Sequence, residues 1–132
     1  MIYTTYFAKL NKLPPEIIPI SICGKAPGFY TGLQCKKFAP KYDFFMKWKE
    51  THDNDYYISC FNEQVLKNLS IKDIWELYRM AYPNLPIEPN IQFMTDNHIA
   101  LVCYEKPTDF CHRHLVSAWI RNFGIPSEEI KI

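Results

Sequence analysis

The sequence predicts a three-layer α/β fold, in which helices cover both faces of a mostly parallel sheet of about four to five strands. Two observations predict this class: segments rich in β-branched and aromatic residues alternate with helical patterns, and the segment His98–Glu105 is nearly continuous in apolar residues. A continuous apolar strand is typical of a parallel sheet that is covered on both faces. The chain has 132 residues, which fits one compact domain spanning residues 1–132.

The first two strands are predicted close to the N-terminus. Ile2–Phe7 is rich in β-branched and aromatic residues. Pro14-Pro15 then excludes a helix at that point of the chain, and Ile17–Cys23 follows as the second strand. Glycine and proline end the second strand and open the loop Gly24–Pro40. This loop is long for a compact domain, and loops of that length often carry function.

A helix, a strand and a helical segment are predicted in the middle of the chain. Tyr42–Glu50 places aromatic residues at helical spacing, and Asp43 is suited to cap its start. Tyr56–Phe61 has the composition of a third strand. Residues 62–69 then continue as a helical segment.

Ser70 begins the next helix, which runs to Ala81. Its hydroxyl can accept a backbone N–H, and Asp73 can return a hydrogen bond in the manner of a capping box. Three prolines follow the helix and predict an irregular segment over residues 82–92.

The strand His98–Glu105 is predicted to be central, and a closing helix follows it. Thr108 or Asp109 can cap this helix, which places Cys111 in its first turn. Gly124, with a proline just beyond it, ends the helix.

Composition and charge exclude several classes of protein. The net charge is only +1, although residues 1–50 carry eight lysines against three acidic residues. Bulk electrostatic binding of nucleic acid is therefore not favoured. No apolar run is long enough to span a membrane, so no membrane partner is expected. The five cysteines do not have the spacing of a disulfide framework, which fits reduced thiols. We therefore expect a cytoplasmic protein.

The segment Cys111-His112-Arg113-His114 is the candidate site, because it follows the central strand where a helix begins. A helix N-terminus stabilises a thiolate and attracts anions. Cys111 is thus a candidate nucleophile or acid/base, and His112 and Glu105 are candidate catalytic partners. Arg113 and His114 are candidate substrate-binding residues.

Three further candidates for substrate binding lie at or beyond the end of the second strand: Ser21, Lys25 and Tyr30. Parallel strands end at one edge of a sheet, so the loop after the second strand is expected near Cys111. The sequence has no serine-hydrolase elbow, zinc-protease helix, phosphate-binding loop or dinucleotide fingerprint, and it requires no cofactor.

Other interpretations of the same residues stay open. Cys111 could be a core residue, and each histidine could equally be structural. Cys103, Cys111, His112 and His114 are competent zinc ligands, but their spacing is not that of a structural zinc site, so no metal is assigned. Cys103 and Cys111 could also form a redox pair.

Several segments together resemble the domain-of-unknown-function 488 family. Leu101–Pro107 leading into Phe110–Val116 is similar to that family's C-terminal pattern, an apolar strand followed by Cys-His-Arg at the start of a helix. Tyr3–Ala8 and Ile20–Ile22 resemble its first two strands.

The resemblance implies an α/β fold and a shared site at Glu105, Cys111, His112 and Arg113. Larger members have an aspartate and an arginine in the second strand where this chain has Ser21 and Cys23, so no role carries over to those positions. The resemblance implies no particular reaction.

The function we expect is that of a small cytoplasmic enzyme acting on a nucleotide-like or otherwise anionic substrate through the Cys-His-Arg site. The alternative is a non-enzymatic module that binds a nucleotide or single-stranded nucleic acid through the basic, aromatic first fifty residues. Salt-sensitive binding that survives loss of Cys111 would favour the alternative.

Overall fold

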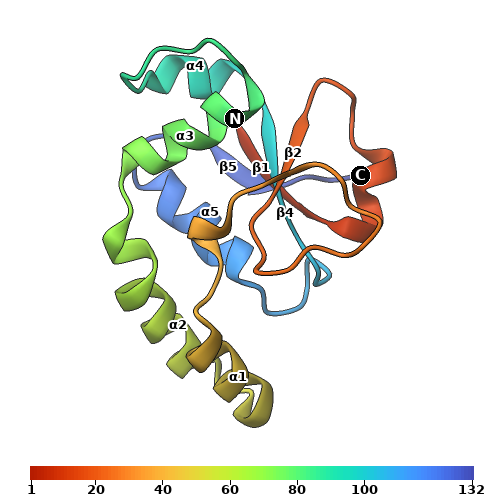
Figure 1. The fold of residues 1–132 in the computed structure, drawn as a ribbon, viewed down its shortest axis with the longest axis vertical. Coiled ribbons are helices and arrows are strands. Elements are labelled where there is room, and N and C mark those ends of the chain that lie inside the picture. The colour runs from red at the N-terminus through yellow and green to blue at the C-terminus, as the bar shows by residue number, and fades with distance from the viewer.

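A five-stranded parallel sheet forms the centre of the computed structural model, which describes residues 1–132 (Figure 1). The strand order is β3-β2-β4-β1-β5, and every neighbouring pair is parallel. This arrangement confirms the predicted α/β class. The strands are β1 (Ile2–Tyr6), β2 (Ile18–Ser21), β3 (Leu33–Gln34), β4 (Ile99–Cys103) and β5 (Ser127–Glu129).

Strand β4 lies in the middle of the sheet and is buried along its whole length, because both faces are covered. Ile99 and Leu101 point into the main core, whereas Val102 packs on the other face against Phe7 and Cys23. Alternating residues therefore serve two cores, which explains why the segment is apolar without interruption.

The α-helices and the 3-10 helix η1 lie on opposite sides of the sheet (Figure 1). Helices α3 and α5 pack on one face, and α1 and α2 form a pair that extends beyond it. The α-helices are α1 (Tyr42–Thr51), α2 (Asn54–Gln64), α3 (Ile71–Ala81), α4 (Ile91–Asp96) and α5 (His112–Arg121). The 3-10 helices are η1 (Phe7–Lys12), η2 (Lys36–Phe38) and η3 (Leu66–Asn68).

The start of α3 has the capping box that its sequence predicts. The Ser70 hydroxyl accepts from the Lys72 N–H at 3.2 Å, and the Asp73 carboxylate accepts from the Ser70 N–H at 2.8 Å. The helix buries Ile74 and Tyr78 on one side, so local capping and tertiary packing favour the same element.

The predicted strand Tyr56–Phe61 is wrong, because these residues belong to helix α2. Tyr57 and Phe61 are four residues apart and are the two buried residues of the helix. Asp53 caps the helix by accepting the Tyr56 N–H at 3.1 Å. Packing of one helical face therefore overrides the strand-like composition of the segment.

The predicted start of the last helix is also corrected. Asp109 donates its N–H to the Lys106 carbonyl at 3.0 Å, which closes a turn instead of a helix. Cys111 itself is the N-cap residue of α5, and His112 is the first helical residue. Five short elements had no prediction: β3 and η2, which lie within the predicted loop, and η1, α4 and β5.

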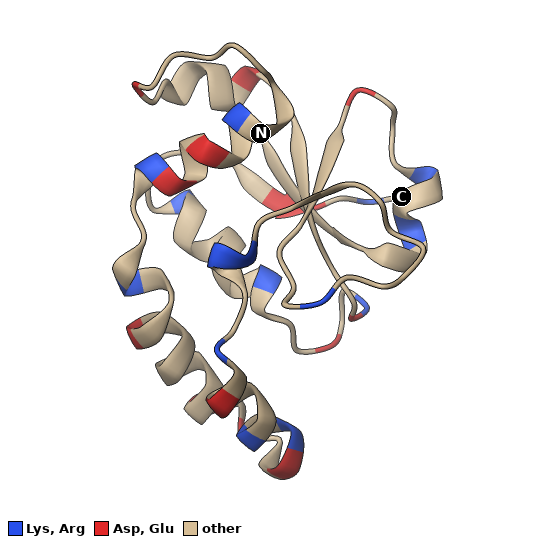
Figure 2. Ribbon diagram, viewed as in Figure 1, with Lys and Arg blue, Asp and Glu red and all other residues tan.

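No helix of the structure combines the length and apolar character that a membrane span needs. Lys and Arg are spread over helices and loops among acidic residues (Figure 2). The excess of lysine in the first fifty residues therefore does not gather on one element.

Replacing the N-cap of α3 should cost measurable stability. We expect Ser70→Ala to lower the free energy of unfolding by about 1 kcal/mol, because the Lys72 N–H loses its partner. Ser59→Ala is the matched control, since Ser59 is exposed within α2. Urea unfolding of both variants measures the difference, and equal midpoints would contradict the assigned cap.

Candidate functional site

The end of β4 and the start of α5 bring two cysteines and a histidine together. Residues 104–110 connect these elements, and a turn at Lys106–Asp109 folds the connection back on itself. Cys103 thus lies at the end of a central strand and Cys111 at the N-cap of a helix. Open α/β sheets bind ligands at this edge.

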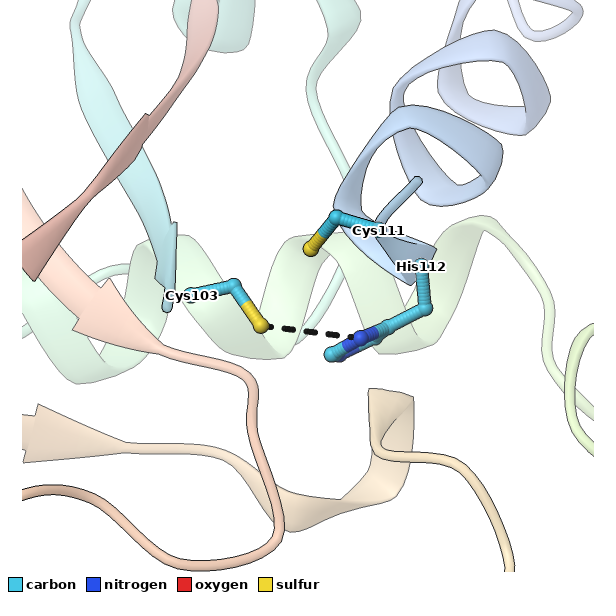
Figure 3. Close-up of side chains that lie close together, drawn as sticks. All are labelled: Cys103, Cys111 and His112. Carbon is cyan, nitrogen blue, oxygen red and sulfur yellow. Dashed lines mark hydrogen bonds between the residues drawn. The ribbon is translucent and has the colours of Figure 1, made fainter. Parts of the chain in front are cut away.

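Cys103, Cys111 and His112 turn their sulfur and nitrogen atoms toward one another (Figure 3). Their ligand atoms all lie within 4.8 Å of one another, and all three residues are buried. Cys103 Sγ is 3.6 Å from His112 Nδ1. The three side chains form one polar cluster, which we call the Cys-Cys-His cluster.

The backbone just beyond β2 fixes the ring of His112. His112 Nε2 lies 2.8 Å from the Ile22 carbonyl oxygen, and a carbonyl can only accept. Nε2 therefore carries the proton and donates it. In the neutral ring this leaves the lone pair of Nδ1 directed at Cys103 Sγ.

Of the two cysteines in the cluster, the environment favours the thiolate form of Cys111. Hydrogen bonding from the Cys103 thiol holds the pKa of Cys111 below its ordinary value, and the positive charge of Arg113 adds to the effect against the cost of burial. The same pairing, together with burial, raises the pKa of Cys103. The start of α5 contributes a further positive partial charge beside Cys111.

Arg113 lies beneath the site and does not line the cavity. Its guanidinium is fully buried and donates from Nε and Nη2 to the Glu129 carboxylate, both at 3.0 Å. Thr4 donates its hydroxyl to the same carboxylate. Arg113 Nη1 is buried without a hydrogen-bond partner. Its positive charge favours the Cys111 thiolate from within the protein. Arg113 was predicted from the sequence to bind substrate.

A cavity of about 690 Å³ opens beside the Cys-Cys-His cluster. Glu105 lines it and is half-buried, and burial followed by the negative charge of Cys111 raises the pKa of its carboxyl. Two lysines and several aromatic residues contribute to the walls. The lining residues are Cys23, Gly24, Lys25, Pro40, Tyr42, Phe45, Trp48, Lys49, Tyr57, Cys103, Tyr104, Glu105, Phe110, Cys111 and His112.

The other predicted substrate-binding residues have different surroundings. Lys25 lines the cavity. Ser21 is buried behind it, with its hydroxyl 3.1 Å from Cys23 Sγ. The Tyr30 hydroxyl donates to the Leu33 carbonyl at 2.6 Å and lies outside the cavity. His114 also lies outside it, with Nε2 buried and unpartnered and its pKa lowered by burial.

Sequence reasoning missed two groups of residues at the site. The aromatic wall from α1, formed by Tyr42, Phe45 and Trp48, was not assigned to the Cys111 site, although its spacing predicted the helix. Glu129 had no predicted role, because β5 was not predicted. The aromatic spacing in α1 was a usable signal, whereas nothing in the sequence near Glu129 indicated its pairing with Arg113.

The Cys-Cys-His cluster could hold a soft metal ion, since two sulfur atoms and one imidazole nitrogen converge. Of the four zinc ligands considered from the sequence, the structure groups Cys103, Cys111 and His112, and it leaves His114 apart.

Removing the Cys103 thiol should make alkylation of Cys111 more dependent on pH. We expect the wild-type rate to stay nearly constant from pH 8 down to pH 6, because the lowered pKa keeps the thiolate populated. In Cys103→Ala the pKa of Cys111 rises, so its rate at pH 6 should fall by roughly tenfold for each unit by which the pKa exceeds the assay pH. Iodoacetamide labelling of chelator-treated protein measures both profiles, with Cys60→Ala as control. Superimposable profiles would contradict the pairing.

The comparisons with known proteins identify the family. The family model described as DUF488-N3a, the active DUF488-N3 subclade, matches residues 29–124. This range includes Glu105, Cys111, His112 and Arg113, and it excludes Glu129. A search of the curated proteins and a search of the solved structures each found no match. Since the match covers most of the chain and agrees with the resemblance seen in the sequence, the chain belongs to the DUF488-N3a family.

Proposed function

We propose that the chain is a small enzyme that acts on a nucleotide-like or otherwise anionic substrate, with Cys111 as its nucleophile. The observation that carries this proposal is the placement of Cys111 at the N-terminus of α5, in the wall of the cavity that Glu105 also lines. The description of the family as an active subclade supports a catalytic role.

The walls of the cavity support a substrate that combines a planar ring with negative charge. Trp48 and Phe110 stack with ring centroids 5.5 Å apart, and Tyr57 meets Phe110 edge-on at 4.9 Å. Such surfaces accept a nucleobase by stacking. Lys25 and Lys49 line the same cavity and can pair with phosphate groups.

The proposed reaction is a nucleophilic substitution in two steps. The Cys111 thiolate forms a bond to an electrophilic atom of the substrate, and the bond to the leaving group breaks with its electron pair. Protonated Glu105 gives its proton to the leaving group, a role that suits a carboxyl with a raised pKa. In the second step, Glu105 takes a proton from a water molecule as the water oxygen attacks the adduct. The bond to sulfur breaks, and Cys111 leaves as the thiolate.

The remaining residues act as supports in this proposal. His112 is held by the Ile22 carbonyl and faces Cys103, so it orients and stabilises the thiol pair. Arg113 adds positive charge from beneath, at a position fixed by Glu129. Five free cysteines fit a reducing compartment, so the proposed location is cytoplasmic.

A non-enzymatic nucleotide-binding module is the second candidate, because aromatic and lysine side chains from the first fifty residues line the cavity. Its support is narrower than the sequence suggested. Phe38 is fully buried, and the Tyr30 hydroxyl is bonded to a backbone carbonyl. Of the four aromatic residues that suggested a binding module, only Tyr42 and Trp48 line the cavity, where Phe45 joins them.

A screen of nucleosides and nucleotides for turnover tests the proposed enzyme. We expect Cys111→Ala to abolish turnover and Glu105→Gln to lower kcat by roughly 10²- to 10⁴-fold, since an amide cannot give up a proton. Cys35→Ala is the control, because Cys35 is a free cysteine that does not line the cavity. Undiminished turnover in Cys111→Ala would refute the nucleophile, and tight binding without turnover in any variant would favour the binding module.

Charge reversal at the cavity tests the anionic part of the substrate. We expect Lys25→Glu combined with Lys49→Glu to weaken binding of a nucleoside monophosphate at least tenfold and to make it less dependent on salt. Binding of the matching nucleoside, which has no phosphate, should be nearly unchanged. Equal losses for both ligands in titration calorimetry would contradict a phosphate contact.

A further inference from the structure

We propose that Cys103, Cys111 and His112 form a zinc-binding site, and that zinc bound there inhibits the chemistry of Cys111. The metal site is inferred from the geometry of the cluster alone. Its inhibitory effect rests on the function proposed above.

One pair of donor atoms has the spacing of a tetrahedral zinc site, and the third donor lies close to both. Zinc binds sulfur at about 2.3 Å and imidazole nitrogen at about 2.0–2.1 Å, so the sulfur-to-nitrogen edge of its tetrahedron is roughly 3.5 Å. Cys103 Sγ and His112 Nδ1 are 3.6 Å apart. The ligand atoms of all three residues lie within 4.8 Å of one another, so a small movement of the Cys111 side chain closes the two edges that its sulfur forms.

His112 has the orientation of a metal-binding histidine. Metal-binding histidines usually donate their second ring N–H to a carbonyl or carboxylate, which fixes the ring and the tautomer. Here Nε2 donates to the Ile22 carbonyl at 2.8 Å, and Nδ1 is left for the metal. The ring therefore needs no rearrangement before zinc binds.

The choice of zinc follows from the donors and their surroundings. Two sulfur atoms and one imidazole nitrogen are soft or borderline donors, which disfavour magnesium and calcium. All three residues are buried, yet the cavity touches each of them. Three protein ligands leave a fourth position that water from the cavity can fill.

Zinc at this site would inhibit the proposed reaction without any change in oxidation state. Coordination requires Cys103 to release its thiol proton to solvent and commits a lone pair of each sulfur to the metal. Cys111 then keeps its charge but cannot attack substrate. Removing zinc with a chelator restores the free thiolate.

Metal titration of the tag-free full chain, after chelator treatment, tests the site directly. We expect one equivalent of zinc to bind, and one equivalent of cobalt(II) to give the sulfur-to-cobalt absorption of a tetrahedral thiolate site. Cys103→Ala, Cys111→Ala and His112→Ala should each weaken zinc binding at least tenfold, in line with the loss of one ligand. Cys35→Ala and Cys60→Ala are the matched controls. Circular dichroism checks folding, and Cys103→Ala decides the result if His112→Ala does not fold.

Substoichiometric uptake, or uptake that all three variants retain, would overturn the site. Inhibition is tested separately by the rate of Cys111 alkylation, which should fall at least tenfold with one equivalent of zinc and recover with chelator. An unchanged rate in zinc-loaded protein would overturn the inhibitory role. If the protein turns over substrate but binds no zinc, only the zinc site is overturned and the proposed function stands. Turnover that requires zinc would overturn both the inhibition and the nucleophile proposed for Cys111.

Discussion

The hydrogen bond from His112 to the Ile22 carbonyl is the interaction on which the arrangement of the site depends. It joins the first residue of the last helix to the backbone just beyond β2, across a long separation in the sequence. Because the carbonyl can only accept, this hydrogen bond places the proton on Nε2 of the neutral ring. The unprotonated Nδ1 then lies toward Cys103. Cys111, next to it at the N-cap, is thereby placed at the wall of the cavity.

The ion pair between Arg113 and Glu129 supplies the second fixed point. A fully buried guanidinium is costly unless it is paired, and here two parallel hydrogen bonds to Glu129 supply the pairing while Nη1 has no partner. The Thr4 hydroxyl donates to the same carboxylate. The pair also joins α5 to β5, so the last strand helps to hold the charge beneath Cys111. The proposed catalysis and the proposed metal binding use the same side chains. A thiolate beside a second thiol and an imidazole can attack a substrate, and the same three groups can bind a soft metal ion.

Sequence reasoning succeeded where local signals and packing agree. The apolar run of β4 and the capping box of α3 are read directly from residue types. It failed at Tyr57 and Phe61, where strand-like composition conflicts with helical burial, and at β5, whose residues Ser127–Glu129 are polar and become a strand only because β1 offers a free edge. Cys111 and Glu105 were named as candidates from their position after a strand. The pairing of Cys103 with Cys111 depends on how the connecting turn folds, which the sequence does not specify.

The most direct measurement of the central claim is which cysteine reacts first. Chelator-treated protein would be exposed briefly at neutral pH to a small alkylating agent, and the modified residues would be mapped by mass spectrometry. The account predicts that Cys111 reacts fastest although only 5% of its surface is exposed, ahead of the half-buried Cys35 and Cys60. A nucleotide that fills the cavity should slow that reaction. Labelling of Cys35 and Cys60 before an inert Cys111 would contradict the account, because exposure alone would then explain the reactivity.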